Sequence, residues 1–68
     1  MTHELQSVLF DRQYWTIPKA KEWLKYYRLK SSDVRTTANH FRFRQTEPIG
    51  ERYRVKHLDN GIELILQF

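Results

Sequence analysis

The sequence predicts an α+β domain in which one helix packs on one face of a mostly antiparallel sheet, in the order β-α-β-β-β. Three observations carry this prediction: apolar residues at helical spacing over 17–29, strict alternation in His40–Gln45 (HFRFRQ), and an Asn60-Gly61 turn between two alternating segments. A single apolar helix stripe and a single apolar sheet face bury each other in two layers. The 68 residues predict one domain over 7–68, after a flexible lead-in over 1–6.

The first elements are a strand and a capped helix. Ser7–Phe10 is a short apolar run that is typical of a strand. Thr16 is placed to cap the helix, and Pro18 falls in the first turn, where a missing N–H has no cost. Trp15 precedes the cap and is expected to pack against Ala20. The apolar stripe of this helix consists of Ile17, Ala20, Trp23, Leu24 and Tyr27.

The remainder of the chain predicts three strands, over 39–45, 52–58 and 62–68, with a loop over 46–51. A two-residue type I′ turn at Asn60-Gly61 sets the pairing of the last two strands. It places Leu64 opposite His57, Leu66 opposite Val55 and Phe68 opposite Tyr53, all on one apolar face. A turn centred on Asp59-Asn60 would shift the pairing by two residues and leave the faces unchanged.

The other face of the sheet is expected to be basic. If strands 39–45 and 52–58 are neighbours, one face gathers His40, Arg42, Arg44, Arg52, Arg54 and Lys56. Like charges across strands are unfavourable, so a face of one sign, on a chain of formal net charge +4, indicates an anionic partner. The ordinary alternative is a solvated polar face. Because Phe41, Phe43 and Tyr53 are expected to point to the core, contact with phosphates fits better than base stacking.

Several function classes find no support in the sequence. His3, His40 and His57 do not show the spacing of a metal site, and the chain has no Cys. Neither a nucleophile elbow nor a glycine-rich phosphate loop is present. We therefore expect a non-enzymatic module without cofactor or metal. No signal peptide and no apolar run near ~20 residues occurs, which predicts an intracellular protein that is neither secreted nor membrane-bound.

Three motifs give the chain a family resemblance: Ser7–Phe10 (SVLF), Ala20–Lys25 (AKEWLK) and Asn39–Gln45 (NHFRFRQ). Together they resemble a small domain found in tailed phages and large DNA viruses, over nearly the whole span 7–68. The resemblance implies a viral or phage origin and a virion or assembly context, with a location in the host cell or the virion. It brings no established activity, and Lys56 lies in a loosely matched part.

Two functions follow as hypotheses. The first is a basic binding module that contacts nucleic-acid backbone, without sequence preference, through His40, Arg42, Arg44, Arg52, Arg54 and Lys56. The alternative is a viral structural or protein-interaction module that binds an acidic protein surface or self-associates.

Overall fold

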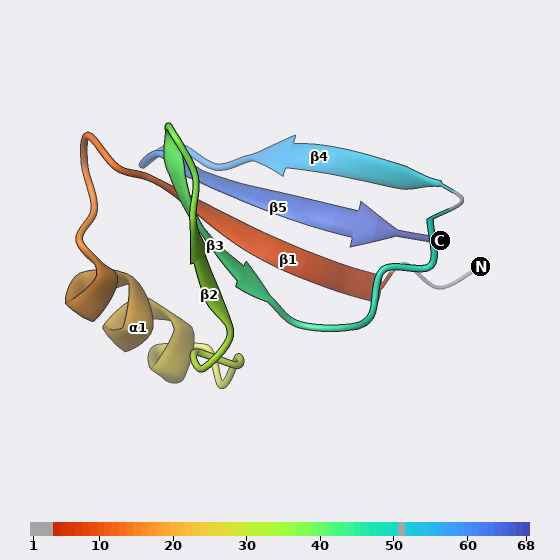
Figure 1. Cartoon of the computed structure of the whole chain (residues 1–68), viewed down its shortest axis with the longest axis horizontal. Helices are drawn as coiled ribbons and strands as arrows, with labels where there is room; N and C mark the ends of the chain where they lie inside the picture. Colours follow the sequence, from red (N-terminus) through yellow and green to blue (C-terminus); the bar gives the residue numbers. More distant parts are fainter. Residues whose placement is uncertain (1–3, 51) are drawn as a thin grey trace.

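The alternating segments of the chain form one antiparallel sheet, and the computed structural model describes residues 4–50 and 52–68. The elements are β1 (Glu4–Asp11), α1 (Ile17–Tyr26), β2 (Val34–Thr36), β3 (His40–Arg44), β4 (Tyr53–His57) and β5 (Ile62–Gln67). The five strands lie in the order β2-β3-β1-β5-β4 (Figure 1). An α+β domain with one helix and an antiparallel sheet is thereby confirmed. The predicted order β-α-β-β-β lacked the short strand β2.

α1 begins and ends at recognisable capping residues. Thr16 is the N-cap, and its side chain accepts a hydrogen bond of 3.4 Å from the backbone N–H of Lys19, as predicted. The helix is shorter than the predicted 17–29 because Arg28 adopts a left-handed conformation with φ 59°. Its N–H bonds to Lys25 O, and the N–H of Leu29 bonds to Leu24 O, which closes a Schellman motif.

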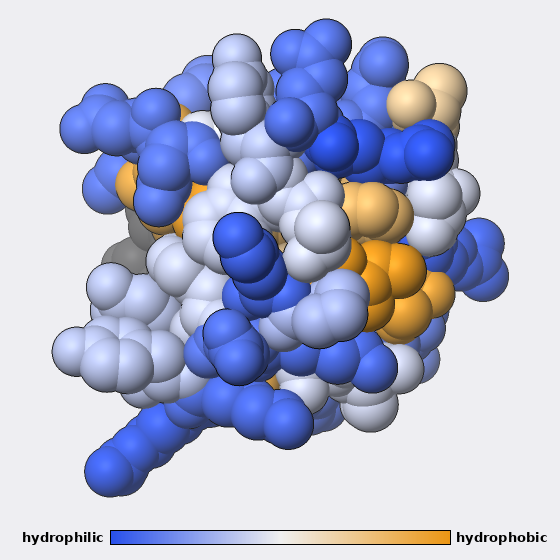
Figure 2. All heavy atoms as spheres, turned by 90° about the vertical axis from the view of Figure 1, so that its left-hand side faces the viewer, coloured by the Kyte–Doolittle hydropathy of each residue, from blue (hydrophilic) through white to orange (hydrophobic). Residues whose placement is uncertain are grey.

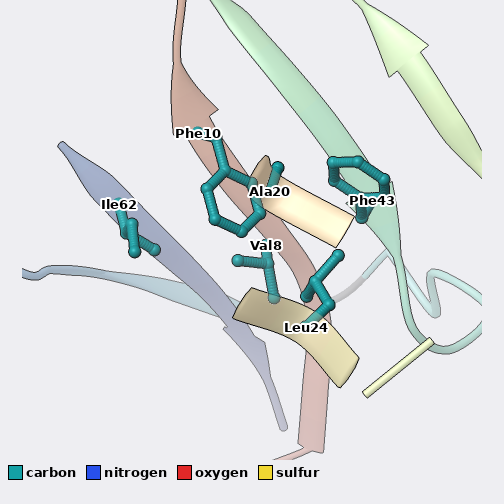
Figure 3. Close-up of a cluster of buried hydrophobic side chains, with 6 residues drawn as sticks. All are labelled: Val8, Phe10, Ala20, Leu24, Phe43 and Ile62. Carbon is teal, nitrogen blue, oxygen red and sulfur yellow. The ribbon is translucent and has the colours of Figure 1, made fainter. Parts of the chain in front are cut away.

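The core lies between α1 and the three central strands. Its fully buried members are Val8, Phe10, Ala20, Leu24, Phe43 and Ile62 (Figure 3). Phe10 is at its centre, with its ring edge-to-face against Trp15, Trp23 and Phe43 at centroid distances of 5.0, 5.6 and 5.6 Å. Phe41 is partly buried against the same cluster, so the predicted inward orientation of Phe41 and Phe43 is confirmed.

β1 begins earlier than the sequence indicated. Glu4 and Leu5, expected within the lead-in, pair with the end of β5, and Gln6 beside them is buried. The register between β1 and β5 shifts between Leu5 and Ser7, so Gln6 is the extra residue of a β-bulge. A bulge breaks the alternation of side chains, and for that reason the pattern did not show a strand here.

The predicted β4–β5 register is wrong. The N–H of Leu58 bonds to Ile62 O at 2.8 Å, which closes a three-residue loop whose last residue, Gly61, has φ +77°. Only Gly61 adopts positive φ here, whereas the predicted type I′ turn needs it at Asn60 as well. The extra loop residue moves the pairing by one position, so Lys56 lies opposite Leu64 and Val55 opposite Ile65. Tyr53, Val55 and His57 therefore lie on the face opposite to the one predicted.

The assumed neighbourhood of strands 39–45 and 52–58 is also wrong. β1 and β5 lie between β3 and β4, which separates these two strands by about 14 Å at the usual strand spacing. Residues 45–50 run from β3 along the end of the sheet toward β4 (Figure 1).

The surface is mostly polar at the end of the molecule where α1 and the hairpin tips lie. Figure 2 shows hydrophilic side chains over most of this end, with small apolar patches between them. Within the described residues, no helix has the length and apolar composition needed to cross a bilayer.

Candidate functional site

The face of the sheet opposite α1, here called the open face, carries arginines from two neighbouring strands. On β3, Phe41 and Phe43 point toward α1, so His40, Arg42 and Arg44 point the other way, as predicted. On the edge strand β2, Arg35 pairs directly with Arg42 and shares its face. Two arginines therefore stand opposite each other on paired strands, and Arg44 follows two residues along β3.

These arginines surround one hollow, which we call the arginine hollow. It has a volume of about 230 Å³ and is lined by Asp33, Arg35, Arg42, Arg44 and Pro48. Among residues 4–50 and 52–68, the ion pairs involve only Glu63 and two histidines, so none of the three arginines forms an ion pair. Asp33 supplies one negative charge at the rim against three positive ones. The hollow is consequently suited to an anion with several acceptor oxygens.

Arg42 differs from its two neighbours because the protein itself holds its side chain. Its Nη2 donates to Gln6 Oε1 at 2.9 Å, and its Nε donates to Ser7 Oγ at 3.2 Å. Gln6 and Ser7 are buried, so these bonds fix the guanidinium against the sheet. Arg35 is exposed, and its side chain has no partner among the described residues. The side chain of Arg42 is thus held in one position, whereas the side chain of Arg35 can change its conformation when a ligand binds.

A second hollow lies beside the first and shares Arg42 with it. Its volume is about 290 Å³, and its lining is Gln6, Leu9, Arg42, Pro48, Gly50, Tyr53 and Ile65. Tyr53 was predicted to be a core residue, but it is 64% exposed on the open face. The open face therefore has an aromatic ring next to its basic part, which overturns the expectation that it carried none.

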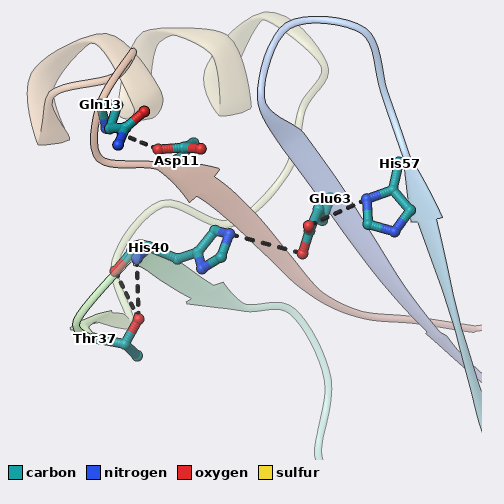
Figure 4. Close-up of polar contacts among 6 residues, drawn as sticks. All are labelled: Asp11, Gln13, Thr37, His40, His57 and Glu63. Carbon is teal, nitrogen blue, oxygen red and sulfur yellow. Dashed lines mark hydrogen bonds and ion pairs between the residues drawn. The ribbon is translucent and has the colours of Figure 1, made fainter.

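His40 lies apart from the arginine hollow and has a partner of its own. The carboxylate of Glu63 lies between two imidazoles on the open face (Figure 4). Its Oε1 is 3.1 Å from His57 Nδ1, and its Oε2 is 3.8 Å from His40 Nε2. The negative charge of Glu63 lies next to His40, so His40 adds little to an anion site.

The remaining predicted site residues do not join the basic face. Arg54 and Lys56 lie opposite Leu66 and Leu64, whose side chains are on the α1 side of the sheet. Arg52 precedes β4 and is exposed. The structure therefore brings together Arg42 and Arg44 but places Arg52, Arg54 and Lys56 elsewhere. The predicted single face of six basic residues is wrong in its membership.

Arg35 was missed by the sequence analysis. The only signal for it is the short β-branched alternation Val34-Arg35-Thr36, which is too brief to separate a strand from a loop.

The described residues show no cluster of three metal-ligating side chains. His3 and Glu51 lie outside the described residues. No family model, no curated protein and no solved structure matches this chain.

Proposed function

We propose that this chain is a small non-enzymatic module, of the phage or viral type that it resembles, which binds the phosphate backbone of nucleic acid in the arginine hollow. The observation that carries the proposal is the convergence of Arg35, Arg42 and Arg44 on one hollow that also contains Asp33, which forms no ion pair with them. Guanidinium groups bind phosphate oxygens in bidentate fashion. A bound phosphate also reduces the electrostatic repulsion between the paired Arg35 and Arg42, which adds to the binding free energy.

The neighbouring hollow favours single strands over duplex. A nucleotide whose phosphate lies on Arg42 has its base next to Tyr53, since both residues line this second hollow. Stacking on one aromatic ring is tolerant of sequence and requires an unpaired base. The expected ligand is therefore single-stranded RNA or DNA, bound with weak sequence preference.

Salt dependence provides the first test. Fluorescence anisotropy of a labelled single-stranded oligonucleotide should give a log–log slope near −2 if about three phosphates are neutralised. Affinity should fall about 20-fold between ~50 and ~200 mM salt. Absence of binding at ~50 mM salt would contradict the proposal, because counterion release is then most favourable.

Charge reversal at matched positions provides the second test. The double variant Arg35→Glu, Arg44→Glu lowers the formal charge by four, from +4, and should weaken binding at least about 100-fold. The double variant Arg54→Glu, Lys56→Glu changes the charge by the same amount on the other face of the sheet. It should retain most of the affinity. Equal losses in both variants would show that net charge, and not the arginine hollow, determines binding.

A further inference from the structure

The second feature of the molecule that suits a partner is the free edge of the sheet at β4. β4 is the last strand in the order β2-β3-β1-β5-β4, and all five of its residues are exposed. α1 lies toward β2 and β3, so within the described residues no element covers β4 (Figure 1). An open strand edge presents backbone N–H and C=O groups to any extended chain that reaches it.

The hydrogen bonds at both ends of β4 show which backbone groups point outward. Leu58 N–H bonds to Ile62 O at 2.8 Å, and Phe68 N–H bonds to Arg52 O at 3.1 Å. Hydrogen-bonded pairs recur at every second residue of an antiparallel ladder, so Arg54 and Lys56 direct their backbone groups toward β5. Tyr53, Val55 and His57 direct theirs away from the sheet.

The side chains of β4 divide into two rows of different chemistry. Arg54 and Lys56 project on the α1 side, and Arg52 precedes them with the same parity. Tyr53 and Val55 project on the open face and are 64% and 43% exposed. An added strand would place its own side chains alternately beside these two rows. Its best sequence alternates carboxylates with apolar residues.

A second copy of the chain does not meet this requirement. If Val55 lay on a two-fold axis, Arg54 would face the Lys56 of the second copy. If Arg54 or Lys56 lay on the axis, that residue would face its own counterpart. Like charges directly opposite each other destabilise a strand pair, and a lysine on an edge strand is a common protection against self-pairing.

We propose that β4 is a docking edge for an extended acidic segment of another protein, which adds to the sheet as a sixth strand. The partner's backbone bonds to Tyr53, Val55 and His57, its carboxylates contact Arg54 and Lys56, and its apolar side chains cover Val55 and Tyr53. The row of Arg54 and Lys56 favours a partner with carboxylates on that side. The row of Tyr53 and Val55 favours apolar residues at the intervening positions of the partner. This interface does not include the arginine hollow, although it shares Tyr53 with the second hollow.

The test uses the whole chain and a short capped peptide in which glutamate alternates with valine. Binding is followed by chemical shifts of the backbone amides, which should change at 53–57 and not at Arg35 or Arg44. A peptide of the same composition with its glutamates contiguous should bind about tenfold more weakly, because it cannot match both rows. Shifts centred on the arginine hollow, or no shifts at ~1 mM peptide and low salt, would overturn the proposal.

Val55→Pro is the variant that isolates backbone pairing. The N–H of Val55 points away from β5, so proline removes no bond of the domain but blocks the added strand. Peptide affinity should fall about tenfold, while the amide spectrum outside β4 stays unchanged. Unchanged peptide affinity in a folded Val55→Pro would contradict strand addition.

Charge reversal on β4 provides a second test that remains valid if Val55→Pro unfolds this strand. Arg54→Glu with Lys56→Glu should lose the acidic peptide and gain a peptide in which lysine alternates with valine. Arg35→Glu with Arg44→Glu should leave acidic-peptide binding intact, which separates this proposal from the nucleic-acid one. Retention of the acidic peptide after the charge reversal, or dimerisation of the unaltered chain through β4, would refute it.

Discussion

Gln6 donates a hydrogen bond of 3.0 Å from Nε2 to Oε1 of Gln67, and both side chains are buried. The same Gln67 Oε1 accepts from Ile49 N at 3.2 Å, and its Nε2 donates to Thr46 Oγ1 at 3.2 Å and Glu47 O at 2.9 Å. One amide thus ties the β3–β4 connection to the end of the sheet. Because Gln6 also accepts from Arg42, this network reaches the arginine hollow.

Gln67→Leu should destabilise the domain by about 3 kcal/mol, since several buried donors and acceptors lose their partner at once. Urea denaturation measures the change as a lower midpoint at similar slope. Gln13→Leu is the control, because the side chain of Gln13 is exposed, and it should stay within about 0.5 kcal/mol of the parent. Equal stability of the two variants would show that the Gln67 network contributes little.

The register error shows where sequence reasoning succeeds and where it fails. Thr16 and Pro18 signal a helix start through local chemistry, and Phe41 and Phe43 signal a buried face through alternation. The pairing of β4 with β5, in contrast, depends on whether the loop holds two or three residues. Asn60-Gly61 suits both, because a single left-handed residue at Gly61 completes the longer loop. Because the loop is one residue longer than predicted, Tyr53 lies on the open face, and Arg54 and Lys56 lie on the α1 side of the sheet.

The order of the strands in the sheet is even harder to predict from local sequence than the register. Nothing in His40–Arg44 or Tyr53–His57 indicates that β1 and β5 separate them, because the order is set by long-range packing around Phe10 and Val8. The predicted basic face therefore contained correct members from β3 and incorrect ones from β4. Arg35 was absent from the prediction because β2 has only three residues.

Gly61→Ala should destabilise the domain more than Gly50→Ala does. Both glycines have positive φ, +77° and +73°, so each substitution carries a backbone cost of about 1 kcal/mol. At Gly61 the new Cβ would also lie 3.1 Å from Tyr14 Cδ2 and 3.2 Å from Asp11 Cβ, whereas at Gly50 nothing lies within 4 Å. Thermal unfolding should rank parent, Gly50→Ala and Gly61→Ala in falling order. The reverse ranking would mean that the β4–β5 loop does not pack against the end of β1.

Arg28→Gly should stabilise the chain by about 0.5–1 kcal/mol. Arg28 closes the Schellman motif at φ 59°, a conformation in which glycine avoids the steric cost of a Cβ. Lys25→Gly, inside the last turn of α1, is the matched control and should cost about 1 kcal/mol. The measurement is the unfolding free energy of each variant in urea. A loss of stability in Arg28→Gly would indicate that its side chain makes a contribution larger than the backbone strain.

Tyr53→Ala should weaken binding of single-stranded oligonucleotides about 5- to 100-fold and leave duplex binding nearly unchanged, because only an unpaired base can stack on the ring. The matched control is Tyr26→Ala, since Tyr26 is 81% exposed on α1 and far from Arg42 in the fold. It should bind both ligands as the parent does. Because Tyr53 is exposed on an edge strand, its removal should change stability by less than about 0.5 kcal/mol, so a loss of binding is separable from unfolding. Equal weakening of single-stranded and duplex binding would assign Tyr53 to general contact with the backbone and would remove the argument for single strands.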